Sequence, residues 1–123
     1  MKKTLILFLL MSVITGFAAA ESMDYKDPGN LKALLESDRS DYLFLDVRTD
    51  AEYAAGHIPS SINIPYDTLP KALPEGTEKD QLIILYCRSG NRSGVGTRAL
   101  VRAGYTNVQD FGGISRWRGP LEK

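Results

Sequence analysis

Two uninterrupted apolar runs constrain the fold of this chain more than any other feature. The first is YLFLDV at residues 42–47, and the second is QLIILY at residues 81–86. A strand with one solvent-exposed face alternates apolar and polar residues, whereas a strand of a parallel sheet covered on both faces is apolar almost throughout. The two runs therefore predict buried parallel strands.

Three segments around these runs have helical patterns. Residues 27–40 and residues 92–105 each place apolar residues on one face, and Thr49 and Glu52 have the capping-box spacing that starts a short helix ending at Gly56. The inward-facing residues expected in the first and last of these helices are Leu31, Leu34, Leu35, Val95, Ala99 and Leu100.

Strands and helices thus alternate along the chain. Shorter strands are expected at residues 61–65 and 107–111, a weak helix within residues 67–80, and a loosely ordered or edge segment at residues 21–26. This order predicts an α/β domain of three layers, with a small, mainly parallel sheet of about five strands and helices on both faces. The length of 123 residues suits one such domain, expected over residues 21–123.

Residues 1–20 have the layout of a secretory signal peptide. Two lysines precede an apolar run at residues 5–17, and small alanines follow it just before Glu21. The run is short for a membrane span, and the pattern predicts cleavage after residue 20 and export to the periplasm. We therefore expect no stable membrane anchoring of the mature chain, whose 13 basic and 15 acidic residues would leave a slightly negative charge.

Composition excludes several classes of function. The formal net charge is zero, so no nucleic-acid-binding surface is expected. One cysteine and one histidine leave no zinc-type ligand cluster, and the single cysteine rules out a C-x-x-C dithiol. Neither a metal site nor a nucleic-acid partner is therefore expected.

The only cysteine, Cys87, directly follows the second apolar run. This places it at the carboxyl end of a strand and ahead of a helix, where open α/β sheets bind ligands. Amides at a helix N-terminus carry partial positive charge and lower the pKa of a thiol placed there. Arg88 and Arg92 add positive charge, and three glycines within residues 90–96 let backbone amides converge. The stretch predicts a nest for an anionic sulfur or for an oxyanion attached to it.

The spacing of the arginine distinguishes two chemistries for this loop. In cysteine-dependent phosphatases an arginine comes six positions after the cysteine, whereas Arg92 comes five positions after Cys87 and Ser93 occupies position six. A shorter loop makes a smaller bowl, which matches one additional sulfur atom better than a phosphate.

Three motifs in order resemble the rhodanese family, the thiosulfate sulfurtransferases. LDVRTDAEYAAGHIPSSINIP at residues 45–65 is similar to the first family signature, YCRSGNRS at residues 86–93 to the active-site loop, and GYTNVQDFGGISRWRGP at residues 104–120 to the C-terminal signature. Together with the predicted export signal, they resemble the single-domain, periplasmic phage-shock-protein E type. The resemblance implies a rhodanese-like three-layer sandwich.

The resemblance also implies a reaction in two steps. A Cys87 thiolate would take the sulfane sulfur of thiosulfate or a similar donor, and the resulting persulfide would pass it to cyanide or a thiol acceptor. No cofactor is implied. Carried over to this sequence, Cys87 is the nucleophile, and the residues of the persulfide-binding loop are Arg88, Ser89, Gly90, Asn91 and Arg92.

The two loop arginines are expected to differ in role. Arg88 is the better candidate for docking an anionic donor, and Arg92 for pointing inward and bracing the loop through a carboxylate. Asp46 is a candidate partner for Arg92, because it ends the preceding strand at the same edge of the sheet. Residues expected to support the loop or the core around it are Asp46, Arg48 and Trp117, while His57 is interpreted as a structural turn residue and Glu52 as a helix cap.

Three other functions remain open from the sequence. They are a non-catalytic rhodanese-like binding module, a phosphatase or arsenate-type enzyme, and a sulfur carrier or redox protein that forms mixed disulfides through Cys87. Small-molecule donors and acceptors are the expected partners, and a domain of this size is expected to be a monomer or a weak dimer.

Overall fold

The computed structural model describes residues 22–123, so the predicted signal peptide lies outside the described residues. Within them, four parallel strands form one sheet in the order β2-β1-β3-β4. The strands are β1 (Tyr42–Asp46), β2 (Ile62–Asn63), β3 (Leu82–Cys87) and β4 (Val108–Gly113). All six residues of β3 are buried, which confirms the interpretation of the second apolar run as a buried parallel strand.

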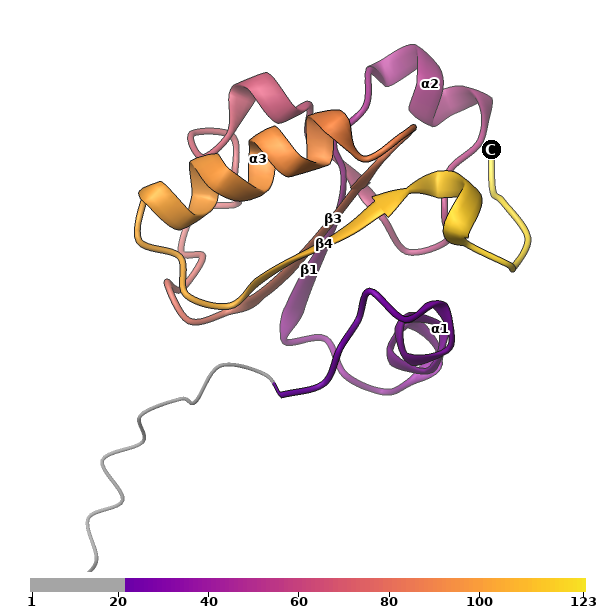
Figure 1. Cartoon of the computed structure of the whole chain (residues 1–123), viewed down its shortest axis with the longest axis horizontal. Helices are drawn as coiled ribbons and strands as arrows, with labels where there is room; N and C mark the ends of the chain where they lie inside the picture. The colour runs from indigo at the N-terminus through magenta and orange to yellow at the C-terminus, as the bar shows by residue number, and fades with distance from the viewer. Residues whose placement is uncertain (1–21) are drawn as a thin grey trace, which may run out of the picture.

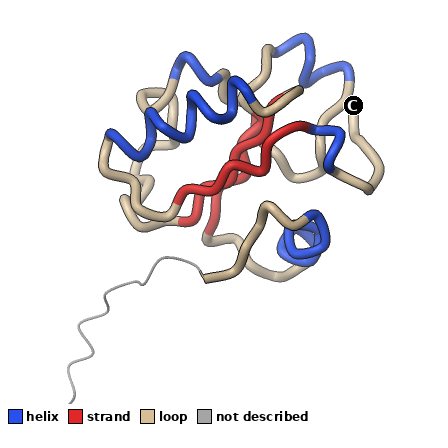
Figure 2. The backbone as a smooth tube through the Cα atoms, viewed as in Figure 1, coloured by secondary structure: helices blue, strands red, loops and turns tan. Residues whose placement is uncertain are grey.

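Helices cover both faces of the sheet, as predicted (Figures 1 and 2). Alternate residues of β3 point to opposite faces, and two apolar clusters result. Ile84 and Tyr86 pack with Leu31 and Leu34 of α1, whereas Leu85 and Cys87 pack with Leu100 of α3. The helices are α1 (Pro28–Glu36), α2 (Asp50–Ala55) and α3 (Asn91–Arg102), with 3-10 turns η1 (Tyr66–Thr68) and η2 (Ile114–Arg116).

The described sheet has one strand fewer than the expected five, and the reason lies at the β4 edge. The backbone of Met23 and Tyr25 bonds to the side chain of Gln109 on β4, at 2.8 Å in each case. The Gln109 amide thus takes the place of a backbone ladder, and the segment before α1 lies beside the sheet without becoming a strand.

The inward face of α3 also differs from the prediction. Leu100 is buried as expected, but Val95 is 44% exposed, and Ser93 and Gly96 face the sheet instead. A Cβ atom on Gly96 would lie 3.0 Å from a methyl group of Leu85, so the helix approaches β3 too closely for a valine on this stripe. The correct inward set is Ser93, Gly96 and Leu100.

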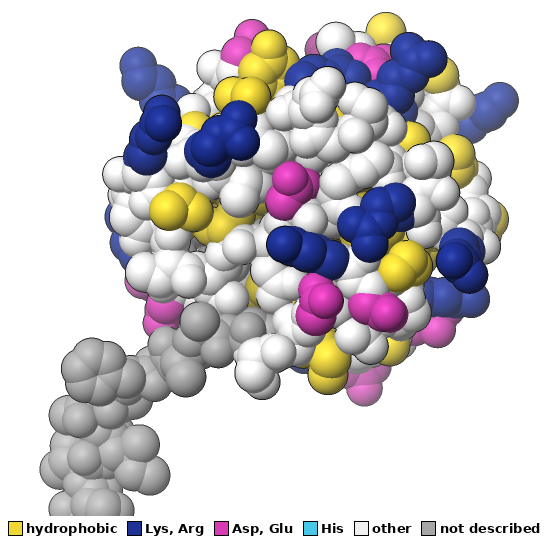
Figure 3. Space-filling view, viewed as in Figure 1, with side chains coloured by type: hydrophobic (Ala, Val, Ile, Leu, Met, Phe, Trp, Pro, Cys, Tyr) yellow, Lys and Arg dark blue, Asp and Glu magenta, His cyan; other side chains and the backbone are white. Residues whose placement is uncertain are grey.

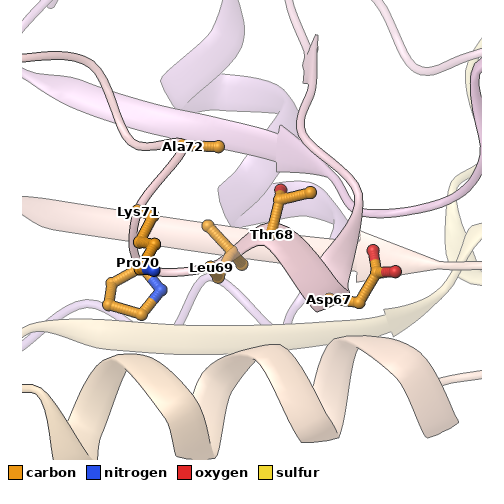
Figure 4. A pocket seen from close by; sticks show the side chains of 6 residues that line it. All are labelled: Asp67, Thr68, Leu69, Pro70, Lys71 and Ala72. Carbon is orange, nitrogen blue, oxygen red and sulfur yellow. The ribbon is translucent and has the colours of Figure 1, made fainter.

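The segment expected to hold a weak helix forms only η1 and a series of turns. Pro70 and Pro74 lack the backbone N–H groups that a longer helix would need. Leu69 is buried against the α3 side of the sheet, and a surface groove of about 540 Å³ runs along residues 67–72 (Figure 4).

The described surface has mixed charge. On the face seen in Figure 3, basic and acidic side chains are interspersed, and hydrophobic side chains appear in small separate groups. Among residues 22–123, no helix has the length and apolar character needed to cross a membrane.

A buried polar network fixes the carboxyl end of β1 against β3. Arg48 binds both carboxylate oxygens of Asp46 and donates to the carbonyl of Gly56. The hydroxyl of Tyr86 donates to Asp46 at 2.7 Å and accepts from the backbone N–H of Ile58 at 3.0 Å. Burial above all raises the pKa of Tyr86, so it remains a hydroxyl and keeps both bonds.

We predict that Tyr86→Phe lowers the free energy of unfolding by about 1–3 kcal/mol, because the buried Ile58 N–H loses its acceptor and Asp46 loses a donor. Urea denaturation measures the change. Tyr42→Phe is the matched control, since the Tyr42 hydroxyl has no hydrogen-bond partner among the described residues, and it is expected to change stability by less than about 0.5 kcal/mol. Equal effects of the two substitutions would contradict a role for the network.

Candidate active site

The sulfur of Cys87 lies inside a loop that curls between β3 and α3. Gly90 adopts a left-handed conformation with a φ of 99°, which glycine reaches without strain. The turn directs the Gly90 N–H at Cys87 Sγ, 3.0 Å away. The thiol also contacts Ser93 Oγ at 3.4 Å. The loop and the first turn of α3 thus surround the sulfur with donors, as the sequence predicts.

The pKa of Cys87 reflects two opposing effects. Burial is the largest and raises it, because a charged sulfur loses hydration. Hydrogen bonds from the Ser93 side chain and from the backbone amides of Ser93, Gly90 and Ser89 lower it. The hydrogen bonds together outweigh burial, and the pKa of Cys87 lies below its ordinary value. The site therefore favours a thiolate, which is the nucleophilic form of cysteine.

Two glycines at the end of β4 allow the loop to sit directly on the sheet. Cys87 and Gly113 are paired in the β3–β4 ladder. A Cβ atom on Gly113 would lie 2.9 Å from the carbonyl oxygen of Arg88, so no other residue fits without moving the loop. Gly112 has a φ of 93° and lies within β4, just past the point where the β3–β4 register shifts.

The two loop arginines have different environments. Arg92 forms a bidentate ion pair with Glu52 of α2, with distances of 2.7 and 2.8 Å. The guanidinium of Arg88 is exposed and forms no hydrogen bond or ion pair with the described residues. Arg92 therefore braces the loop, while Arg88 keeps a free cation next to Cys87.

The candidate partner Asp46 for Arg92 is wrong. Asp46 is buried and already bound by Arg48, by Tyr86 and by the backbone of Arg48. Glu52 lies in the first turn of α2, which starts just beyond β1, and its carboxylate completes the predicted capping box with Thr49 while it binds Arg92. The sequence did contain a signal for the binding of Arg92 by Glu52. The carboxylate of Glu52 follows the first strand, so it lies at the same edge of the sheet as the cysteine loop.

The remaining predicted residues lie outside the hydrogen-bonding shell of the sulfur. His57 bonds through Nδ1 to the carbonyl oxygen of Tyr53 at 2.9 Å and stacks on the Tyr53 ring, as expected of a structural turn residue. Trp117 packs with the cluster on the α1 side of the sheet and donates to the carbonyl of Pro120. Cys87 faces the other side, so Trp117 supports the core behind the loop and not the loop itself.

The chemistry of the site is that of a nucleophile with an anion-attracting rim. Among residues 22–123, no three His, Cys, Asp or Glu side chains are grouped so that they could bind a metal ion. Arg92 is held by Glu52, and Arg88, the residue after Cys87, is exposed and carries the other guanidinium of the loop. Ser93, which sequence analysis did not single out, is the one side chain bonded to the sulfur within the described part of the chain.

We predict that the carboxyl group of Glu52 titrates near pH 2, because the hydrogen bonds from Arg92 above all lower its pKa from 4.5 to about 2. The pair therefore stabilises the fold above pH 4.5, and this contribution is lost as the pH falls toward 2. Both side chains are more than a quarter exposed, so the contribution is about 0.5–1 kcal/mol. Carbon-detected NMR of the Glu52 carboxyl group measures the midpoint.

In the Arg92→Gln variant this midpoint should rise toward 4.5. Arg88→Gln removes the same charge from the same loop without touching Glu52, and the midpoint should stay near 2. A midpoint that is unchanged by Arg92→Gln would show that the ion pair does not form in solution.

Comparisons with known proteins agree with this geometry. The rhodanese-like domain family matches residues 27–119. A sulfurtransferase of Allochromatium vinosum is 39% identical over 66% of this chain and 76% of its own length. The Alr3790 protein from Anabaena sp. has a TM-score of 0.71 at 29% identity, covering 78% of this chain and 89% of that one. A rhodanese with anions from E. coli has a TM-score of 0.58 at 30% identity, covering 67% and 98%.

Other relatives are much longer than this chain. The adenylyltransferase and sulfurtransferase UBA4 of Meyerozyma guilliermondii is 34% identical over 68% of this chain, which spans only 22% of that protein. The similarity to such proteins therefore covers one part of each. With the family match over most of the described residues and the cysteine loop at the carboxyl edge of a parallel sheet, the chain belongs to the rhodanese-like domain family.

Proposed function

We propose that this protein is a sulfurtransferase that moves the sulfane sulfur of thiosulfate, or of a similar donor, through a persulfide on Cys87 to cyanide or a thiol acceptor. The observation that carries the proposal is the environment of Cys87 Sγ, which receives the Gly90 N–H at 3.0 Å and has a lowered pKa. Nucleophilic cysteines are activated in this way. The naming of the Allochromatium vinosum relative as a sulfurtransferase supports it.

In the first step the Cys87 thiolate attacks the outer sulfur of thiosulfate. A bond forms between Cys87 Sγ and this sulfur, and the sulfur–sulfur bond of thiosulfate breaks. Its electron pair leaves with sulfite, a dianion, and the persulfide keeps one negative charge. The free Arg88 cation and the converging loop amides oppose the charge of the dianion in both the donor and the leaving group.

In the second step the acceptor attacks the outer sulfur of the persulfide. With cyanide, a carbon–sulfur bond forms, the sulfur–sulfur bond breaks, and its electron pair returns to Cys87 Sγ as a thiolate. Thiocyanate leaves, and the enzyme is regenerated. The two steps balance without a cofactor or an external oxidant.

The proposal includes the cellular location. Residues 1–20 read as a signal peptide that is removed on export, so the mature domain of residues 21–123 would work in the periplasm. An unpaired thiolate in an oxidising compartment is exposed to mixed-disulfide formation. Cys87 is fully buried at the base of its loop, which restricts access to small donors and acceptors.

We predict that thiosulfate adds about 32 Da, the mass of one sulfur atom, to the intact protein, and that cyanide removes it with formation of thiocyanate. Mass spectrometry of the purified domain detects the adduct, and Cys87→Ser should show none. If no donor gives the adduct while the wild type, and not Cys87→Ser, hydrolyses an aryl phosphate, the protein is a phosphatase instead.

We also predict that Arg88→Gln raises the Michaelis constant for thiosulfate about tenfold with a smaller change in kcat, because it removes a charge-assisted contact to the donor. Steady-state thiocyanate production measures both constants. Arg102→Gln makes the same charge change in the last turn of α3, away from the loop, and should behave as the wild type. An unchanged Michaelis constant in Arg88→Gln would refute the docking role.

A further inference from the structure

The hydroxyl of Ser93 occupies a position between two acceptors. Ser93 is fully buried in the first turn of α3. Its Oγ lies 3.4 Å from Cys87 Sγ and 3.1 Å from the carbonyl oxygen of Gly90. While Cys87 is a thiol, the chain of bonds runs in one direction, with the S–H donating to Oγ and the Ser93 O–H donating to Gly90.

When Cys87 loses its thiol proton, the hydrogen bond between Cys87 Sγ and Ser93 Oγ must change direction. A thiolate cannot donate, so its contact with Oγ is favourable only if the Ser93 O–H turns toward the sulfur. A hydroxyl proton rotates freely enough to do so, and a hydrogen bond to a charged acceptor is about twice as strong as one between neutral groups. The sulfur therefore competes successfully with the Gly90 carbonyl for this proton.

The Gly90 carbonyl does not lose its last partner when Ser93 turns away. It also accepts the backbone N–H of Gly94 at 3.0 Å. A buried carbonyl with no donor would cost free energy, but here the helical bond remains. The rotation therefore exchanges a second, neutral bond for a charge-assisted one and leaves no buried group unpaired.

We propose that Ser93 is a catalytic residue whose hydroxyl proton switches between the Gly90 carbonyl and the Cys87 sulfur as the sulfur gains and loses charge. It donates to the thiolate before the first step and turns back when Sγ becomes the neutral inner sulfur of the persulfide. It donates again when the sulfur–sulfur bond breaks and the electron pair returns to Sγ. The first part concerns only the thiolate, and the second part rests on the proposed function.

The rotation of the Ser93 hydroxyl affects the leaving group of the second step, which is Cys87 Sγ. A sulfur leaves faster from a sulfur–sulfur bond when the pKa of its thiol is lower. Ser93 stabilises Sγ at the moment it becomes charged, so it speeds persulfide discharge as well as raising the fraction of thiolate. A merely structural serine would affect neither quantity specifically.

Other charged or titratable groups around the loop do not bond to Cys87 Sγ or to Ser93 Oγ. Arg92 is neutralised by Glu52, and Arg116 is bound to the carbonyls of Phe111 and Lys26. Those on the loop and on the elements around it are Arg88 of the loop, Arg92 and Arg98 of α3, Glu52 of α2, Tyr66 of η1, Asp110 of β4 and Arg116 of η2. Their charges are the same in wild type and in Ser93 variants, so they cancel in the comparison.

The test uses two measurements on Ser93→Ala, which is smaller than serine and favours helix. The pH dependence of iodoacetamide alkylation gives the thiolate pKa, which is expected to rise by about one pH unit when a bond to the charged sulfur is lost. Single-turnover discharge of the preformed persulfide by cyanide, measured well above this pKa, is expected to slow about tenfold. Ser93→Thr keeps the hydroxyl and should restore both quantities to within about threefold of the wild type.

Thr97→Val is the matched control. It removes a hydroxyl from the same helix one turn later, and the Thr97 hydroxyl has no hydrogen-bond partner among the described residues. Overlapping alkylation profiles of wild type and Ser93→Ala, or equal shifts in Ser93→Ala and Thr97→Val, would overturn the proposal. An unchanged discharge rate would overturn the leaving-group role. If the wild type forms no persulfide, the proposed function fails, while the alkylation profiles still decide whether Ser93 donates to the thiolate.

Discussion

The position of the Cys87 sulfur depends on the hydrogen bonding of β3 along both of its edges. β3 pairs in parallel with β1 on one side and with β4 on the other, and all of its residues are buried. A strand held in this way cannot shift its register without moving its side chains to the wrong face of the sheet. Cys87 is therefore fixed at the carboxyl edge, and the following turn at Gly90 and helix α3 are built around an immobile sulfur.

The two arginines of the loop, Arg88 and Arg92, differ because only Arg92 has an ion-pair partner among the described residues. Glu52 ties Arg92 to α2, and the buried pair of Asp46 and Arg48 ties the end of α2 to the sheet through the carbonyl of Gly56. These bonds hold the rim of the bowl in place. The guanidinium of Arg88, in contrast, is exposed and forms no such bond with the described residues. Because Arg92 has an ion-pair partner and Arg88 has none among the described residues, the two arginines of the loop are not equivalent.

Local sequence patterns predicted the secondary-structure elements. They did not predict contacts between elements that are far apart in the sequence. Apolar runs, capping spacing and the place of the cysteine are properties of short segments, so β1, β3, the α2 cap and the loop were predictable. The pairing of Arg92 with Glu52 joins residues 40 positions apart and depends on how α2 meets α3. Val95 was misplaced because apolarity alone favours it inward, whereas the close approach of α3 to Leu85 selects Gly96.

The opposing effects of burial and hydrogen bonding on the pKa of Cys87 determine how reactive the sulfur is. Burial raises the pKa of the thiol and the hydrogen bonds lower it, so the thiolate exists only while the donors of the loop remain aligned. In a more open site the same charge would be stabilised by water, and large thiols or disulfides could reach it. A buried sulfur is instead stabilised by its hydrogen bonds with Gly90 and Ser93. The stability of the thiolate thus depends on the protein and not on the solvent.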